Sequence, residues 1–242
     1  GNLDFSGTDS FTFKVIDPDG GESEECTVTI TVQPGNDSPM PVIAVSPTVD
    51  LGPTVPGINV MSPNNVGACV TLDGTQSSDV DNDSSDLTFT WLVNDMVVGT
   101  GPVLTDVCLL VGENEVALVV NDGTGEPGDC DESSEGEKIE MVNVITGAEA
   151  AEELLLQINE TTIVSRKKKQ QFIATAKNAA SAFERGSMGA GLNMLEALIN
   201  KFEAQLKDEA DKDVRDEWVE LTQGIIDGLS EPVTCEGCSE AP

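Results

Sequence analysis

The chain has 242 residues, enough for two or three small domains and too few for a large multidomain enzyme. Its 44 acidic and 12 basic residues give a formal net charge of −32 at pH 7, and it contains neither histidine nor tyrosine. So few cations argue against nucleic acid and anionic membrane surfaces as partners. The lack of imidazole excludes Ser-His-Asp hydrolysis and His-ligated zinc. No apolar run reaches the length of about 18 residues that a membrane-spanning helix needs.

Charge and composition both change near Thr146 and Gly147. Residues 1–145 contain 26 acidic and 2 basic residues and are rich in Val, Thr, Asp, Gly and Pro. Residues 146–242 contain 18 acidic and 10 basic residues and are rich in Ala, Leu, Glu and Lys. This predicts a β region followed by a helical region. The acidity of the β region has three open interpretations: a solvated surface of an extracellular protein, adaptation to high salt, or calcium ligands.

The first segment predicts a β-hairpin. Residues 9–16 and 26–33 alternate apolar and polar side chains, and Asp17-Pro-Asp-Gly-Gly between them is typical of a turn. Residues 1–36, ending at Asn36-Asp-Ser-Pro, resemble the last two strands of a bacterial cadherin-like tandem repeat. An isolated hairpin is marginal in water. The remaining strands are therefore either left out of this chain, which begins at Gly1 as a processed or excised piece, or supplied by another chain through strand complementation.

Residues 37–146 predict a β-sandwich of the immunoglobulin-like class. Seven short strands are expected, near 42–47, 68–75, 87–94, 96–100, 103–110, 114–121 and 137–145. The segments 70–79, 87–91 and 112–122 resemble the PKD domain family, although the usual Asp-Phe-Gly-Asp-Gly turn is replaced by Leu92-Val-Asn-Asp-Met. Trp91 lies on the third expected strand, so we expect its indole in the core between the sheets.

An acidic cluster at one end of this sandwich is the best candidate for a site. The loop after the second strand holds Asp79, Asp81, Asp83 and Asp86, and it does not match an EF-hand. Asp37 in the preceding linker and Asp122 after the sixth strand are expected at the same end. Glu126, Asp129, Asp131 and Glu132 follow in the later loop. The carboxylates predict a Ca²⁺ that stiffens the joint between the two β modules; the alternative is a solvated acidic rim.

Six cysteines indicate an oxidising compartment. Cys69 and Cys108 are expected on neighbouring strands and facing outward, which allows a cross-strand disulfide. Cys235 and Cys238 form a close pair in the tail (231–242), where a local disulfide is expected because no strand and helix flank it as in a redox motif. The pairing of Cys26 and Cys130 stays open.

Residues 147–230 predict an antiparallel bundle of three or four helices. Apolar residues recur every three or four positions in four stretches, within 154–158, 172–183, 192–206 and 214–229. The stretch from Gly189 to Ala204 resembles the central helix of the FIMAH domain, a helical module of secreted and surface bacterial proteins. The only basic run is 166–169. It is either a solvated helix start or a surface that docks on the acidic β half of a neighbouring copy.

Taken together, the sequence predicts a multidomain β and α protein of extracellular or cell-surface location. The first hypothesis is a non-catalytic structural or adhesive protein that self-associates, as a filament subunit does, and whose partners are copies of itself or neighbouring surface modules. The alternative is a carbohydrate- or protein-binding accessory module cut from a larger secreted enzyme. Exposed aromatic platforms would support glycan binding, but both tryptophans are expected to be buried. An enzyme is disfavoured because no cleft signature accompanies the aspartates.

Overall fold

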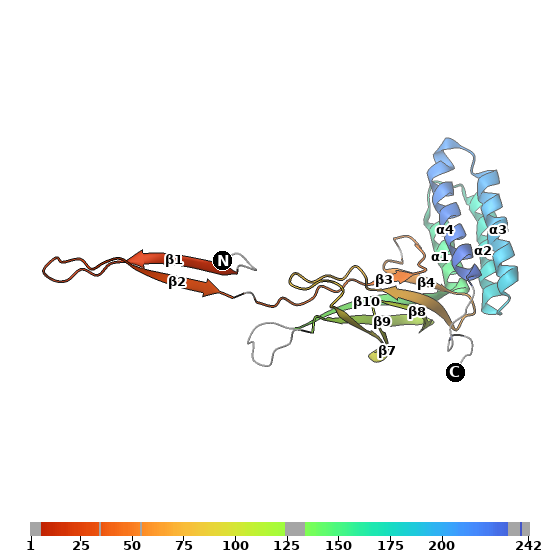
Figure 1. Cartoon of the computed structure of the whole chain (residues 1–242). Coiled ribbons are helices and arrows are strands. Elements are labelled where there is room, and N and C mark those ends of the chain that lie inside the picture. The colour runs from red at the N-terminus through yellow and green to blue at the C-terminus, as the bar shows by residue number, and fades with distance from the viewer. Residues whose placement is uncertain (1–5, 34, 54, 124–133, 232–237, 239–242) are drawn as a thin grey trace.

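The computed structural model describes residues 6–33, 35–53, 55–123, 134–231 and 238. Three parts follow one another along the chain (Figure 1): a hairpin that extends away from the rest, a body of β-strands, and a group of helices. We call them the hairpin (residues 6–33), the β body (the described residues between 40 and 146) and the helical region (147–230). The fold is therefore β followed by α, with the change of structure at Gly147, where the composition changes.

The hairpin consists of β1 (Gly7–Phe13) and β2 (Cys26–Val32), paired antiparallel in a continuous register from Gly7 opposite Val32 to Phe13 opposite Cys26. The segment that connects β1 to β2 contains the expected turn. In it, the Asp17 carboxylate accepts hydrogen bonds from the backbone N–H groups of Asp19 (3.0 Å) and Gly21 (2.7 Å).

The β body contains eight strands in two sheets that face each other across one core. One sheet has the order β4-β10-β9-β6-β7 and the other the order β3-β5-β8. The strands are β3 (Ala44–Ser46), β4 (Ile58–Ser62), β5 (Gly67–Asp73), β6 (Thr88–Val93), β7 (Met96–Thr100), β8 (Val103–Leu110), β9 (Gly112–Asn121) and β10 (Glu135–Thr146). All seven strands expected in this region are present.

The eighth strand, β4, was not predicted from the sequence. Its residues are Ile-Asn-Val-Met-Ser, which is too short a segment to show a convincing alternation. It pairs in parallel with the end of β10, from Ile58 opposite Val142 to Ser62 opposite Thr146. Such a pairing depends on a distant segment of the chain, so the local pattern does not reveal it.

Trp91 lies at the centre of the β body, as predicted. Its side chain is fully buried among apolar residues of both sheets, and its Nε1–H donates a hydrogen bond to the carbonyl of Gly101 at 2.9 Å. A buried indole needs a partner for its single N–H group. Because the ring is fully buried and its N–H group is paired with the backbone of the turn between β7 and β8, Trp91 is structural rather than a surface for ligands.

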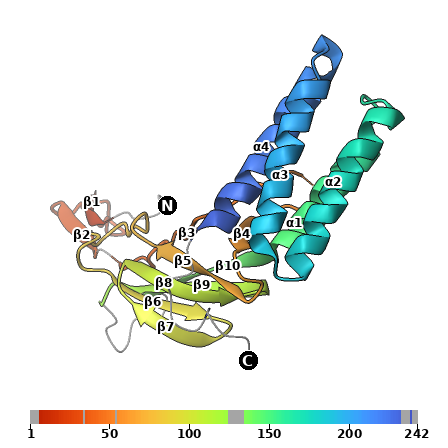
Figure 2. The same cartoon turned by 90° about the vertical axis from the view of Figure 1, so that its right-hand side faces the viewer.

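The helical region contains four helices that rise from one end of the β body (Figure 2). They are α1 (Gly147–Glu160), α2 (Arg166–Glu184), α3 (Met188–Gln205) and α4 (Lys212–Ser230), with a short 3₁₀ turn at Glu209–Asp211. Consecutive helices contact one another, and α4 also contacts α1. Phe172, Phe202 and Trp218, three residues from the expected apolar stripes, pack ring against ring in their core.

The β body and the helical region share a core. Thr146, the last residue of β10, is the N-cap of α1, and its side chain forms a capping box with Glu149. Leu51, Met61 and Ile145 of the β body pack in the same apolar cluster as the helices. The two parts are therefore one packed body, and no linker separates them. Within the described residues, no helix has the length and apolarity needed to cross a membrane.

Candidate functional site

Three chain segments meet at the end of the β body that faces the hairpin. Asn36 of the linker donates a side-chain hydrogen bond to the Asp122 carboxylate at 2.7 Å. The backbone N–H of Asp37 donates to the Asp81 carboxylate at 2.9 Å. The linker, the loop that contains residues 78–86, and the end of β9 are thus held together, as the sequence predicted. We call this meeting point the acidic junction.

Asp79 organises the loop at the acidic junction. Its Oδ1 accepts hydrogen bonds from the backbone N–H groups of Asp81 (2.7 Å) and Asn82 (2.9 Å). Its Oδ2 is buried and has no hydrogen-bond partner among the residues that the structure describes. Asp122 is also buried, with 5% of its surface exposed. A buried carboxylate oxygen without a partner is unfavourable, and a hard cation or a water molecule would satisfy it.

The structure brings together only part of the predicted ligand set. Asp37, Asp79, Asp81 and Asp122 take part in the junction, whereas Asp83 and Asp86 are exposed and no side-chain hydrogen bond joins them to it in the described part of the chain. Glu126, Asp129, Asp131 and Glu132 lie outside the described residues. Among the residues that are described, no three acidic or cysteine side chains converge closely enough to hold a metal ion. The donors are oxygens, as Ca²⁺ prefers, but they are not gathered into a compact cage.

The hairpin has two chemically different faces. Residues directly opposite each other in an antiparallel pair lie on the same face. By the register, one face therefore carries Thr8, Ser10, Thr12, Thr27, Thr29 and Thr31. The other face carries Phe11, Phe13, Cys26, Val28, Ile30 and Val32, together with Asp9. We call the second one the apolar face.

No described residue covers the apolar face. Phe11 is 53% exposed and Ile30 is 50% exposed, and of the fourteen strand residues only Val28 is even partly buried. The alternation that predicted the hairpin is therefore real, but the burial that normally accompanies it is missing.

The disulfide pairings expected from the sequence are wrong. Cys108 is bonded to Cys238, with the two Cα atoms 5.6 Å apart, so neither a Cys69–Cys108 nor a Cys235–Cys238 bond forms. Cys69 is also disulfide-bonded, and Cys26 is an exposed free thiol. Cys130 and Cys235 lie outside the described residues.

The expected strand geometry around these cysteines is nevertheless correct. Cys69 lies directly opposite Cys108 on neighbouring strands, and both side chains face away from the core. What sequence reasoning missed is that Cys238, from the C-terminal tail, lies against that outer face. Gly67 leaves room for it: a Cβ atom there would lie only 2.9 Å from the Cys238 sulfur. The side chain of Asn64 also donates a hydrogen bond to the Cys238 carbonyl.

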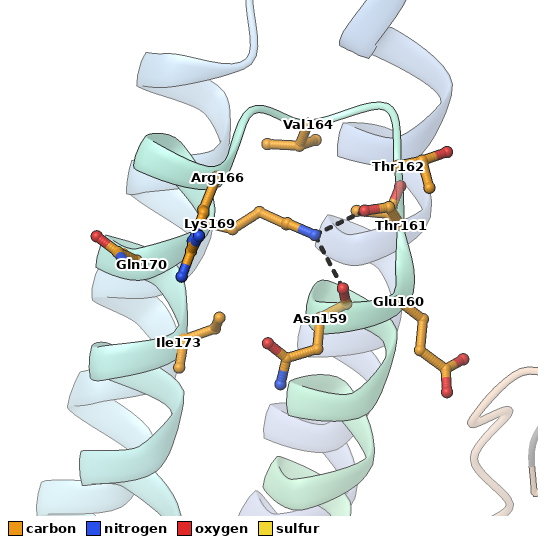
Figure 3. Close-up of a pocket in the computed structure, with 9 residues that line it drawn as sticks. All are labelled: Asn159, Glu160, Thr161, Thr162, Val164, Arg166, Lys169, Gln170 and Ile173. Atoms are coloured by element: carbon orange, nitrogen blue, oxygen red, sulfur yellow. Dashed lines mark hydrogen bonds between the residues drawn. The ribbon is translucent and has the colours of Figure 1, made fainter.

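A cavity of about 550 Å³ lies between the end of α1 and the start of α2 (Figure 3). The Lys169 side chain crosses between the two helices and donates hydrogen bonds to the carbonyl oxygens of Asn159 (2.8 Å) and Thr161 (2.7 Å). Lysine in this position satisfies carbonyl groups that the end of α1 leaves without helical partners. The basic run at 166–169 is therefore the first turn of α2, and part of it is structural.

No family model matches the chain, and no match was found among curated proteins.

Proposed function

We propose that this chain is a non-catalytic structural or adhesive protein of the cell surface that associates with copies of itself through its hairpin. In this proposal the hairpin is the end of a cadherin-like repeat, the β body is a PKD-like sandwich of the immunoglobulin-like class, and the helical region is a FIMAH-like bundle. The observation that carries the proposal is the uncovered apolar face of the hairpin. The buried Trp91 and the four packed helices support the two domain resemblances.

The exposed apolar face leaves the hairpin without the burial that stabilises most β-sheets. A two-stranded sheet is marginally stable alone, and full burial of a side chain such as Phe11 or Ile30 contributes roughly 1.5–3 kcal/mol. Strands from a second copy would bury the apolar face and pair with the free edges of β1 and β2, which offer unpaired backbone groups. Self-association would therefore supply what the hairpin lacks within one chain.

A test of self-association can use the native thiol of Cys26, which lies on the apolar face. Sedimentation velocity over a range of concentrations should show association, and the reactivity of Cys26 toward a thiol reagent should fall as the chain associates. The double variant Phe11→Thr/Ile30→Thr should associate much more weakly than wild type, whereas Thr8→Ser on the opposite face should behave as wild type. A wild-type chain that stays monomeric with a fully reactive Cys26 would refute the proposal and favour an accessory module of a longer secreted chain.

Calcium is the second part of the proposal. A Ca²⁺ ion at the acidic junction would satisfy the buried Oδ2 of Asp79 and reduce the repulsion between the carboxylates of Asp79, Asp81 and Asp122. These side chains come from two segments held to the linker by hydrogen bonds, so binding would stiffen the joint between hairpin and β body.

Thermal unfolding tests this part. The midpoint should rise when Ca²⁺ replaces a chelator, because a ligand that binds only the folded state stabilises it. Asp79→Asn should abolish the rise, whereas Asp95→Asn, in an exposed turn between β6 and β7, should keep it. Equal midpoints with Ca²⁺ and with chelator would leave the junction as a solvated acidic rim.

A further inference from the structure

Positive charge is concentrated at one end of the molecule. In the first 145 residues the only basic residues are Lys14 and Lys138, and each pairs with a neighbouring glutamate. Seven of the twelve basic residues lie in or next to the two loops farthest from the β body, α1–α2 and α3–α4 (Figure 1): Arg166, Lys167, Lys168, Lys169, Lys207, Lys212 and Arg215. We call this end of the helical region the tip.

Some of these cations are already engaged within the tip. Lys168 pairs with Asp211 at 2.8 Å and with Asp208 at 3.6 Å, and Arg215 pairs with Asp216. Arg166 and Lys167, in contrast, are exposed and form no ion pair within the described part of the chain. They remain available to a partner.

Arg166 also lines the cavity between α1 and α2. Val164 and Ile173 supply its apolar surface, and Arg166 and Lys169 supply its positive charge (Figure 3). Glu160 also lines the cavity, but its carboxylate points away from Lys169. The start of α2 also lies at the cavity and adds the positive end of the helix dipole, and its N-cap residue Ser165 makes no side-chain capping bond. The cavity therefore suits an acidic group that carries apolar neighbours.

The turn of the hairpin has that chemistry. Residues 14–25 contain five acidic residues, and the single Lys14 is paired with Glu22. Val15 and Ile16, which precede the acidic turn, are 60% and 64% exposed. Ile163, beside the cavity, is 56% exposed as well. The two surfaces match in charge and in apolar character, and they lie at distant ends of one molecule (Figure 1).

We propose that the tip cavity of one copy binds the acidic hairpin turn of a second copy, residues 15–25, in a head-to-tail contact. This inference rests on the proposed self-association and names one of its contact surfaces. Two different complementary surfaces on one chain form heterologous, head-to-tail contacts, which build rings or open filaments rather than isologous dimers. The turn projects beyond β1 and β2, so the contact leaves the apolar face free for strand pairing.

A charge-reversal experiment on the full chain tests the contact. Arg166→Glu should weaken self-association by about tenfold in sedimentation velocity at low salt, because it replaces an attraction by a repulsion at the interface. The matched control is Lys177→Glu, which makes the same change at an exposed position farther along α2 and should leave association unchanged. Asp19→Lys/Glu24→Lys should weaken association as Arg166→Glu does, and an equimolar mixture of the two variants should associate better than either alone.

The outcomes separate this proposal from the proposed function. If Arg166→Glu associates as wild type does while Phe11→Thr/Ile30→Thr associates much more weakly, the tip contact is wrong and strand complementation stands. If the apolar-face variant associates as wild type does and Arg166→Glu does not, the tip contact stands and strand complementation is wrong. Equal weakening by Arg166→Glu and Lys177→Glu, or no gain in the mixture, would also overturn the tip contact.

Discussion

The hairpin and the β body are made of similar alternating strands, but they bury their apolar side chains to very different degrees. In the β body, Trp91, Leu109 and Leu118 are completely buried between two sheets. In the hairpin, Phe11, Phe13 and Ile30 remain about half exposed. A strand pattern therefore specifies which face is apolar and says nothing about whether a second layer exists to cover it.

The largest expected difference concerns truncation of an aromatic side chain, compared between the exposed hairpin and the core of the helical region. Phe202→Ala removes a fully buried ring that packs against Phe172 and Trp218, and it should lower the free energy of unfolding by about 3–5 kcal/mol. Phe11→Ala should change the stability of the monomer by less than about 0.5 kcal/mol. Urea unfolding followed by tryptophan fluorescence measures both. Equal losses would mean that the hairpin is packed against the rest of the chain.

The C-terminal tail offers a second comparison. The Cys108–Cys238 bond closes a chain separation of 130 residues, so the double variant Cys108→Ser/Cys238→Ser should lose about 2–4 kcal/mol of stability. Cys26→Ser, in the exposed hairpin, should leave the unfolding midpoint of the monomer unchanged. Urea unfolding of the non-reduced proteins provides the measurement, and an unaltered midpoint for the double variant would argue that the tail is not held to β8.

A smaller effect is expected where the β body meets the helical region. Thr146→Ala removes the side-chain cap of α1 and should destabilise the protein by about 1 kcal/mol, whereas Thr146→Ser keeps the hydroxyl and should be close to neutral. Thermal unfolding with circular dichroism distinguishes the two variants. Equal midpoints would show that packing alone fixes the start of α1.

The smallest effect involves pH at the tip. The hydrogen bond to Asp211 raises the pKa of Lys168 above its ordinary value of 10.5. A raised pKa in the folded state means that this contribution is present at neutral pH and is lost as the pH rises through the raised pKa. Lys168→Met should therefore lower the thermal unfolding midpoint at pH 7 by a few degrees. It should also make this midpoint depend less on pH above about pH 10.5. Lys177→Met is the control and should do neither.

Much of the architecture could be predicted from the sequence because periodic burial leaves a local pattern. The apolar stripes of the four helices, the seven alternating strands and the core position of Trp91 all follow from residues close together in the chain. β4 could not be predicted, because its evidence is its parallel pairing with the distant strand β10. The meeting of the three segments at the acidic junction was predicted, whereas the exposed positions of Asp83 and Asp86 were not.

The sequence by itself determined the order of β and α structure, the two faces of the hairpin and the segregation of charge, because each depends on residue type and local spacing. Only the tertiary structure decided that Cys108 pairs with Cys238 and that the β body and the helices share one core. Both depend on distances between segments more than a hundred residues apart. Such distances result from the packing of the whole chain, and no local pattern records them.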